Sequence, residues 1–177
     1  MRGYFGIGVE GISKPMNVGN LFRSAHAFGA SFVFWIRPHN TAFRAPSDTS
    51  RAHAHLPTYT WSSPAEIDLP QGCKLVGIEL LEEAVDLPSF KHPLQAAYVL
   101  GPERGSLSPE LTKRCDHIVK IPTKFCVNVG IAGAIVMYDR LLALGRFATR
   151  PLHDGGTGET QAPHVHGLAR MRRKPRE

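Results

Sequence analysis

The first side chains in the sequence that could take part in chemistry are Asn17 and Arg23, in the segment Pro15–Ala25. Arg23 is expected close to the apolar stripe of a helix, where a guanidinium should be paired or positioned to meet an anion. Asn17 stands at the predicted start of that helix, so on local evidence alone it is an N-cap. The two residues are nearly two helical turns apart, so they would share a side of the helix only approximately.

A lone carboxylate and a second asparagine follow in two later turns. Glu103 belongs to the Gly-Pro-x-x-Gly turn at 101–105, directly after an apolar strand. Ligands of open α/β sheets bind at the carboxyl ends of strands, so Glu103 is a candidate binding residue. The alternative is a tight turn in which Glu103 is simply exposed to solvent. Asn128 opens a helix in which Gly and Ala occupy 130 and 132–134. Each helical Gly costs about 1 kcal/mol relative to Ala, so close packing against a ligand or another helix is expected.

A further glycine motif is a false lead. Gly6–Gly11 matches the G-x-G-x-x-G string of dinucleotide-binding folds, which needs its glycines in a strand-to-helix turn and an acidic residue about 20 positions later. Here Gly6 and Gly8 fall inside a predicted strand, and residues 25–37 contain no Asp or Glu. We therefore reject a dinucleotide loop at this position.

Short apolar strands alternate with helices along the chain. This alternation predicts an α/β fold with a mostly parallel sheet and helices on both faces. Ser108 and Pro109 are the expected N-cap and first residue of a short helix, and Gly29 is an expected C-cap. The predicted strands cover 4–9, 31–36, 74–78, 96–100 and 117–121, and the other two helices cover 17–28 and 128–145.

The 177 residues fit one domain over 1–150 followed by a tail over 151–177. The chain carries a net charge of +6, and residues 146–177 hold seven Lys or Arg against three Asp or Glu. We expect the Gly-, His- and Arg-rich tail to be flexible, and it could contact phosphates without sequence preference. Residues 38–57, rich in Pro, Ser and Thr, are predicted as a long surface loop.

Several classes of protein are not expected. No apolar run reaches the roughly 18 residues of a membrane helix, and no signal peptide is evident. Three widely spaced cysteines favour a reduced, cytoplasmic setting. No metal site is predicted, because the pairs His53/His55 and His164/His166 lack further ligands at convincing spacing.

The motifs occur in a characteristic order: N-x-G-x-x-x-R-x-A, then L-G-x-E-x-G, then I-P followed by a helix that begins N-V. Over roughly residues 4–147 this series resembles the SpoU (TrmH-like) branch of the SPOUT RNA methyltransferases. The resemblance implies a deep trefoil knot, an exception to the rule against knotted chains, with about Ile121–Phe147 as the threaded segment. It also implies a homodimer whose sites are completed by the partner, with the last helix serving both core and interface.

The cofactor implied by the resemblance is S-adenosylmethionine, bound within the knot. Gly and Pro loops would expose backbone groups to adenine, while Leu and Ile would cover its faces. Carried onto this chain, the pocket would be lined by eight residues: Ile78, Leu100, Gly101, Glu103, Ile121, Pro122, Val127 and Asn128.

The implied reaction is 2′-O-methylation of an RNA ribose, with tRNA, and its wobble ribose, placed ahead of rRNA. Arg23 would activate the hydroxyl, either as the base or as an electrostatic clamp on the developing alkoxide. Asn17 and Asn128 would orient Arg23 or the ribose, and Glu103 would fix its loop or pair with an arginine. Cys126 stands where many relatives carry Ser. Two alternatives stay open: a base-methylating SPOUT enzyme and a catalytically idle RNA-binding protein of the same fold.

Overall fold

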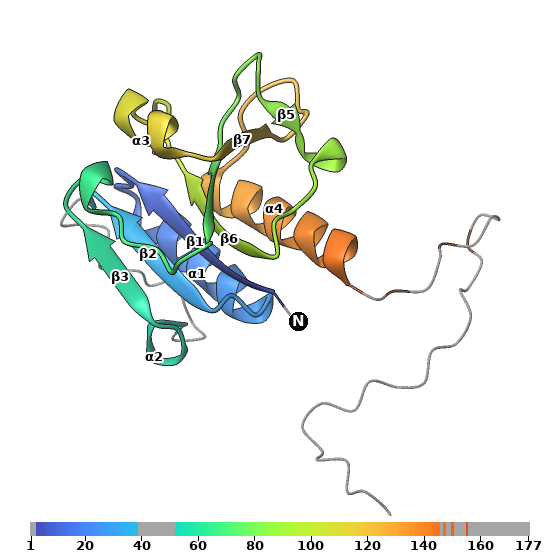
Figure 1. Ribbon diagram of the computed structural model, residues 1–177, viewed down its shortest axis with the longest axis horizontal. Helices are drawn as coiled ribbons and strands as arrows, with labels where there is room; N and C mark the ends of the chain where they lie inside the picture. Colours follow the sequence, from blue (N-terminus) through green and yellow to red (C-terminus); the bar gives the residue numbers. More distant parts are fainter. Residues whose placement is uncertain (1–2, 39–51, 146, 148–149, 151–154, 156–177) are drawn as a thin grey trace, which may run out of the picture. The chain divides into compact units, whose positions relative to one another are not determined.

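The computed structural model describes residues 3–38 and 52–145, together with positions 147, 150 and 155. Contacts divide the chain into a unit over 1–145 and a unit over 146–177, and the description below concerns the first (Figure 1). The expected tail over 151–177 lies outside the described residues except at Gly155, and the expected loop over 38–57 is described only at its two ends.

Seven parallel strands form one sheet in the order β3-β2-β1-β6-β4-β7-β5, which confirms the predicted α/β class. The sequence pattern missed β3, an exposed edge strand, and β5, which has only two residues. The strands are β1 Tyr4–Glu10, β2 Phe32–Ile36, β3 Thr58–Trp61, β4 Lys74–Ile78, β5 Val85–Asp86, β6 Gln95–Leu100 and β7 His117–Lys120.

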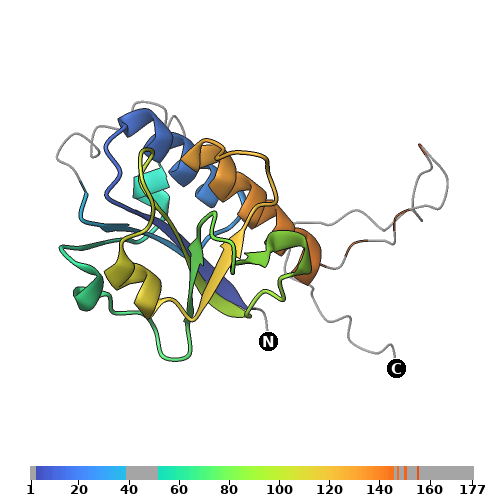
Figure 2. The ribbon, with the colours of Figure 1, turned by 90° about the horizontal axis from the view of Figure 1, so that it is seen from above.

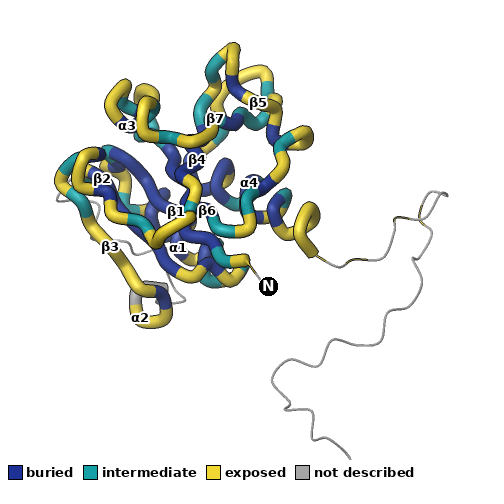
Figure 3. The backbone as a smooth tube through the Cα atoms, in the orientation of Figure 1, coloured by how far each residue is buried: buried dark blue, intermediate teal, exposed yellow. Residues whose placement is uncertain are grey.

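Helices cover both faces of the sheet (Figure 2). Residues of α1 and α4 share one apolar core with the sheet, and α3 packs with residues of the η2 region on the other face. The central strands between these layers are almost entirely buried (Figure 3). The helices are α1 Pro15–Ala27, α2 Ala52–His55, α3 Pro109–Arg114 and α4 Val129–Leu144, with short 3₁₀ turns η2 Pro64–Glu66 and η3 Leu87–Ser89.

The helix ends agree with the sequence in three places. Ser108 caps α3, with Pro109 as its first residue, because the Ser108 hydroxyl accepts a hydrogen bond from the Leu111 amide. Gly29 follows the last residues of α1 with a φ of 74°, as expected of a C-terminal glycine. Asn128 caps α4.

Two expectations about α1 are wrong. The helix begins at Pro15 with Lys14 as its N-cap, so Asn17 lies within the first turn and caps nothing. Arg23 is exposed, whereas its neighbour Phe22 is buried. Because each residue advances a helix by about 100°, the residue that follows the buried stripe turns away from it.

The glycines of β1 make room for aromatic rings. A Cβ atom at Gly6 would overlap the ring of Phe32, and one at Gly8 would overlap the ring and carbonyl of Phe34. Both rings belong to the core beneath α3. The G-x-G string therefore serves packing between β1 and β2, and its rejection as a cofactor loop is consistent with its place inside the strand.

Substitution of Gly6 tests this packing. Gly6→Ala should lower the free energy of unfolding by about 1–3 kcal/mol, because the new methyl group overpacks the core. Phe32→Leu should lower the free energy of unfolding less when it is made in the Gly6→Ala variant than when it is made in the wild-type protein. The smaller Leu side chain leaves space for the new methyl group. Urea denaturation of the two single variants and the double variant measures this coupling, and strictly additive effects would contradict it.

Candidate active site

The carboxyl ends of three neighbouring strands, β6, β4 and β7, surround a cavity of about 350 Å³. The segments that follow these strands supply most of its walls, and α1 and α4 complete it. Because parallel strands bring their carboxyl ends to the same edge of a sheet, residues far apart in sequence meet here.

Seven of the eight residues predicted to contact a cofactor line this cavity: Ile78, Leu100, Gly101, Glu103, Ile121, Val127 and Asn128. Pro122, the eighth, is exposed and does not line it. The wall also includes four residues that the sequence did not single out: Lys14, Glu79, Leu80 and Thr123. Cys126 and Ala132, one of the small residues expected to allow close packing, line it as well.

A chain of hydrogen bonds joins Glu103, Asn17 and Asn128. The Asn17 side-chain amide donates to Glu103 Oε1 at 3.0 Å, and the Asn128 side-chain amide donates to Asn17 Oδ1 at 2.9 Å. Asn17 is only 7% exposed, so both halves of its amide group need partners. The structure thus brings together one residue from each of the three sequence motifs.

Asn128 acts on two elements at once. Its side-chain oxygen accepts the backbone N–H groups of Gly130 (2.9 Å) and Ile131 (3.4 Å), which caps α4. Its side-chain nitrogen donates to Asn17 on α1. A Cβ atom at Gly130 would lie only 3.1 Å from Asn20 Cβ, so the small residue allows the two helices to approach.

Glu103 is held by donors from α1 and the turn before it. Besides Asn17, the backbone amide of Lys14 donates to Oε1 at 3.0 Å, and the amide and hydroxyl of Ser13 lie 3.4 Å from Oε2. Partial burial opposes ionisation of the carboxyl, but hydrogen bonds from its own backbone amide, Asn17, Lys14 and Ser13 outweigh it and lower the pKa of Glu103. Glu103 is therefore a fixed anion at the cavity wall.

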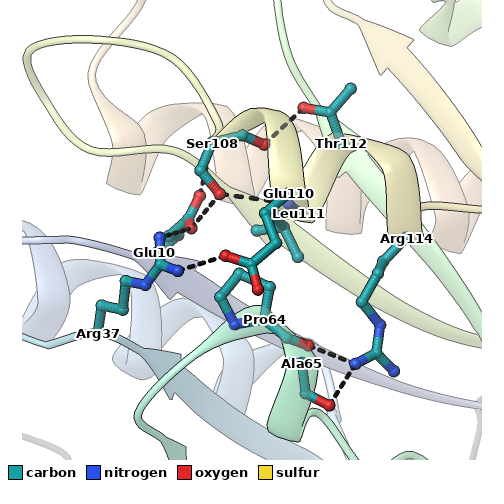
Figure 4. A network of polar contacts seen from close by, with 9 residues as sticks. All are labelled: Glu10, Arg37, Pro64, Ala65, Ser108, Glu110, Leu111, Thr112 and Arg114. Atoms are coloured by element: carbon teal, nitrogen blue, oxygen red, sulfur yellow. Dashed lines mark hydrogen bonds and ion pairs between the residues drawn. The ribbon is translucent and has the colours of Figure 1, made fainter.

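Two further carboxylates hold the same loop, residues 101–108. Glu79 Oε2 accepts the backbone amide of Leu107 at 2.7 Å. Glu10, only 4% exposed at the end of β1, accepts both the amide (2.8 Å) and the hydroxyl (2.6 Å) of Ser108. Figure 4 shows Glu10 with Ser108 and with Arg37, which bridges Glu10 and Glu110. The loop is therefore anchored at three separate points.

Arg23 does not line the cavity. It lies in a second, adjacent hollow between α1 and α4, together with Ser24, Phe28, Ile131 and others. Asn128 lines both the cavity and this hollow. The fourth predicted catalytic residue is thus next to the other three but on a different surface.

The signal for Glu79 was present in the sequence, since it directly follows a predicted strand, as the Glu103 turn does. Glu10 was concealed within the rejected glycine motif. Ser13 and Lys14 act mainly through backbone amides, and side-chain patterns carry no signal for such contacts.

Other chemical features of the described residues are few. All three cysteines have free thiols. No group of three or more His, Cys, Asp or Glu that could hold a metal ion occurs in the described part of the chain, and His164 and His166 lie outside it. Within the same residues, no helix is long and apolar enough to cross a membrane.

Comparison with known proteins matches residues 5–138 to the SpoU rRNA Methylase family. A curated relative, the tRNA (guanosine(18)-2′-O)-methyltransferase TARBP1 of Mus musculus, is 25% identical over an alignment of 142 residues that covers 72% of this chain and 9% of that protein. The chain spans less than half the length of either of the first two curated relatives that it matches.

Solved structures share the fold. The SpoU methyltransferase AviRb from Streptomyces viridochromogenes, crystallised with the cofactor AdoMet, aligns with a TM-score of 0.70 at 21% identity, covering 80% of this chain and 61% of that one. A structure described as giving insights into the 2-OH methylation of C/U34 on tRNA aligns with a TM-score of 0.68 at 25% identity, covering 82% of this chain and all of the other.

The lowered pKa of Glu103 predicts a pH-dependent contribution to stability. A carboxyl whose folded pKa lies below its ordinary value near 4.5 stabilises the fold above that value, and the contribution is lost as the pH falls through the lowered pKa. Glu103→Gln should therefore cost about 1–2 kcal/mol at pH 7 and progressively less below pH 4.5. Urea unfolding of both proteins between pH 3 and 7 measures the difference.

Asn20→Ser is the matched control, because Asn20 is an exposed asparagine of the same helix outside this network. The free energy of unfolding of Asn20→Ser should differ little from that of the wild-type protein, and the difference should not depend on pH. A cost of Glu103→Gln that stayed constant from pH 7 to pH 3 would contradict the anchoring assigned to the carboxylate.

Proposed function

We propose that this chain, which belongs to the SpoU rRNA Methylase family, transfers a methyl group from S-adenosylmethionine to a ribose 2′-hydroxyl of RNA. The observation that carries the proposal is the meeting of Asn17, Glu103 and Asn128 at one cavity. These three residues come from three separate motifs of the family pattern.

The cavity suits S-adenosylmethionine in size and in chemistry. Its volume of about 350 Å³ falls in the range of about 300–1,000 Å³ that is usual for small-molecule sites. Ile78, Leu100 and other apolar residues offer surfaces for an adenine ring. The carboxylates of Glu79 and Glu103 carry the charge opposite to that of a sulfonium and an ammonium group, which supports binding of this cofactor.

Bound S-adenosylmethionine would supply an electrophilic methyl group and its sulfur leaving group. The chain must then align the ribose oxygen and accommodate its proton. Arg23, in the hollow that shares Asn128 with the cavity, is the proposed group for this task. Because guanidinium groups rarely release a proton, we favour Arg23 as a clamp on the developing alkoxide over Arg23 as the base.

As the RNA substrate we propose tRNA in preference to rRNA, and within tRNA the ribose of the wobble nucleotide is the first candidate. Two relatives support this order: one is named for guanosine 18 of tRNA, and the other structure concerns position 34 of tRNA. The alignment with the second covers 82% of this chain and the whole of the other. Methylation of a base and RNA binding without catalysis are the alternatives that experiment must exclude.

We also propose the trefoil knot, with residues 121–147 threaded through the loop 79–94. Contacts close this loop on both sides. Lys120 Nζ donates to the carbonyl of Leu81 at 3.2 Å, and Arg140 of α4 donates to the carbonyls of Pro93 (2.6 Å) and Leu94 (2.9 Å). These contacts join the loop 79–94 to β7 on one side and to α4 on the other, which supports a threaded position for the segment that connects β7 to α4.

A homodimer is the proposed assembly, formed through the exposed side of α4. Val136 lies in the core, whereas Ile131 is 56% exposed and Tyr138 is 52% exposed. Leu141 and Leu142 are also exposed. An apolar row of this kind supports an interface with a second copy, which would bring the partner's α1 and α4 toward the hollow that contains Arg23.

Filling the cavity should block the cofactor. Ala132→Leu introduces a larger side chain at the cavity wall and should weaken binding of S-adenosylmethionine at least about tenfold, since a site too small for its ligand must distort. Ala143→Leu, at an exposed position of the same helix, is the matched control. Isothermal titration calorimetry measures both, and equal affinities of the two variants would place the cofactor elsewhere.

Removing the guanidinium should impair transfer without impairing cofactor binding. Arg23→Ala should lower kcat by about 10²–10³ and leave the affinity for S-adenosylmethionine unchanged, because Arg23 does not line the cavity. Arg23→Lys should recover part of the rate if positive charge is what matters. Lys113→Ala, at an exposed cation of α3, is the control, and methyl transfer by Arg23→Ala at the wild-type rate would exclude the proposed role.

A further inference from the structure

Phe125 is the most exposed large apolar side chain in the described part of the chain, at 78%. It belongs to the segment between β7 and α4, which lines the cavity through Thr123 and Cys126. Phe125 itself does not line the cavity, but it directly precedes Cys126, which does. Burial of an aromatic side chain contributes favourably to folding or binding, and this ring contributes to no core of the described residues.

The backbone that carries Phe125 is held in place. The Thr123 hydroxyl donates to the Phe125 carbonyl at 2.9 Å, and the Thr123 amide donates to the Ile121 carbonyl at 2.7 Å. On the other side, Asn128 is fixed by α1 and by its own helix. An exposed ring on a fixed backbone loses little conformational freedom when it binds, which suits a recognition role.

Three cations belong to the segments that form the cavity. Lys14 lines the cavity, Arg104 lies between two lining residues, and Lys124 directly precedes Phe125. All three side chains are exposed, and none of the ion pairs between described residues involves them. Lys14 lines the cavity together with Glu79 and Glu103, whereas Arg104 and Lys124 are not among its lining residues. This pattern is complementary to a phosphate chain that passes over the mouth of the cavity.

We infer that Phe125 stacks on an unpaired nucleobase of the RNA substrate, while Lys14, Arg104 and Lys124 contact the neighbouring phosphates. The inference rests on the proposed function and names the form of its substrate: at this site the RNA is single-stranded, with a base turned out of its stack. Aromatic rings beside basic residues are the usual platform for single-stranded RNA, and they read stacking more than sequence.

RNA fits this surface better than a second copy of the chain does. The immediate neighbours of Phe125 in sequence are Lys124 and Cys126, both exposed, and Pro122 is exposed as well. The apolar row proposed for the dimer lies on α4, at Ile131, Tyr138, Leu141 and Leu142. An isolated ring among cations is complementary to a base and its phosphates, whereas a dimer contact would be expected to continue the apolar row.

Two probes of equal charge separate stacking from electrostatics: the RNA hexamer hexaadenylate and an abasic ribose-phosphate hexamer. The wild-type protein should bind hexaadenylate at least about fivefold more tightly, because stacking on one ring contributes to affinity only when a base is present. Phe125→Leu should abolish this preference, whereas Phe125→Trp should keep it. Lys124→Gln should lower the affinity for both probes by the same factor and reduce the salt dependence of binding.

Methyl transfer to unfractionated tRNA and to ribosomal RNA gives a second readout, in which Phe125→Leu should raise KM by a larger factor than it lowers kcat. Sedimentation and thermal unfolding of each variant verify assembly and folding. A preference for hexaadenylate retained by Phe125→Leu would overturn the inference, as would a change in oligomeric state caused by this variant. Failure of the proposed function is distinct, because the wild-type protein would then methylate no RNA while the hexamer comparison still reports on Phe125.

Discussion

The side-chain amide of Asn17 has one donor group and one acceptor group directed at different partners, and the site depends on both. Its nitrogen donates to Glu103 and its oxygen accepts from Asn128, across sequence separations of 86 and 111 residues. The two ends of the amide satisfy an anion on one side and an N–H donor on the other. A carboxylate at position 17 would repel Glu103, and an apolar residue would leave both partners unsatisfied.

Anchoring by carboxylates extends from this point to the whole loop at 101–108. Glu103 ties the loop to the start of α1, Glu79 ties it to the end of β4, and Glu10 ties it to the end of β1. Each carboxylate accepts at least one backbone amide, and Glu103 and Glu10 also accept side-chain donors, so the loop has a defined shape before any ligand arrives. A preorganised cavity of this kind loses little free energy to ordering when it binds a ligand.

The sequence predicts the central elements because their periodicity reflects burial. β1, β2, β4 and β6 are largely apolar and buried along most of their length, as strands covered on both faces must be. β7 is shorter, and only Val119 in it is fully buried. β3 escaped prediction because Thr58–Trp61 is an exposed edge, and β5 because two residues carry no period. The motif order brought Asn17, Glu103 and Asn128 into one hypothesis, but the cap expected at Asn17 was wrong. A Pro at N1 moved the helix start, and tertiary partners claimed the side chain. Arg23 is exposed because its position in the helical turn directs it away from the buried stripe, although several residues near it in sequence are apolar.

The central claim is that this site methylates a ribose oxygen of RNA. The most direct measurement incubates the purified protein with S-adenosylmethionine labelled in its methyl group and with tRNA, then locates the label by mass spectrometry of the digested nucleosides. We predict that the label appears in the ribose fragment of a single nucleoside and not in its base. Label in a base, or none in any nucleoside of tRNA or rRNA while the cofactor binds, would contradict this account.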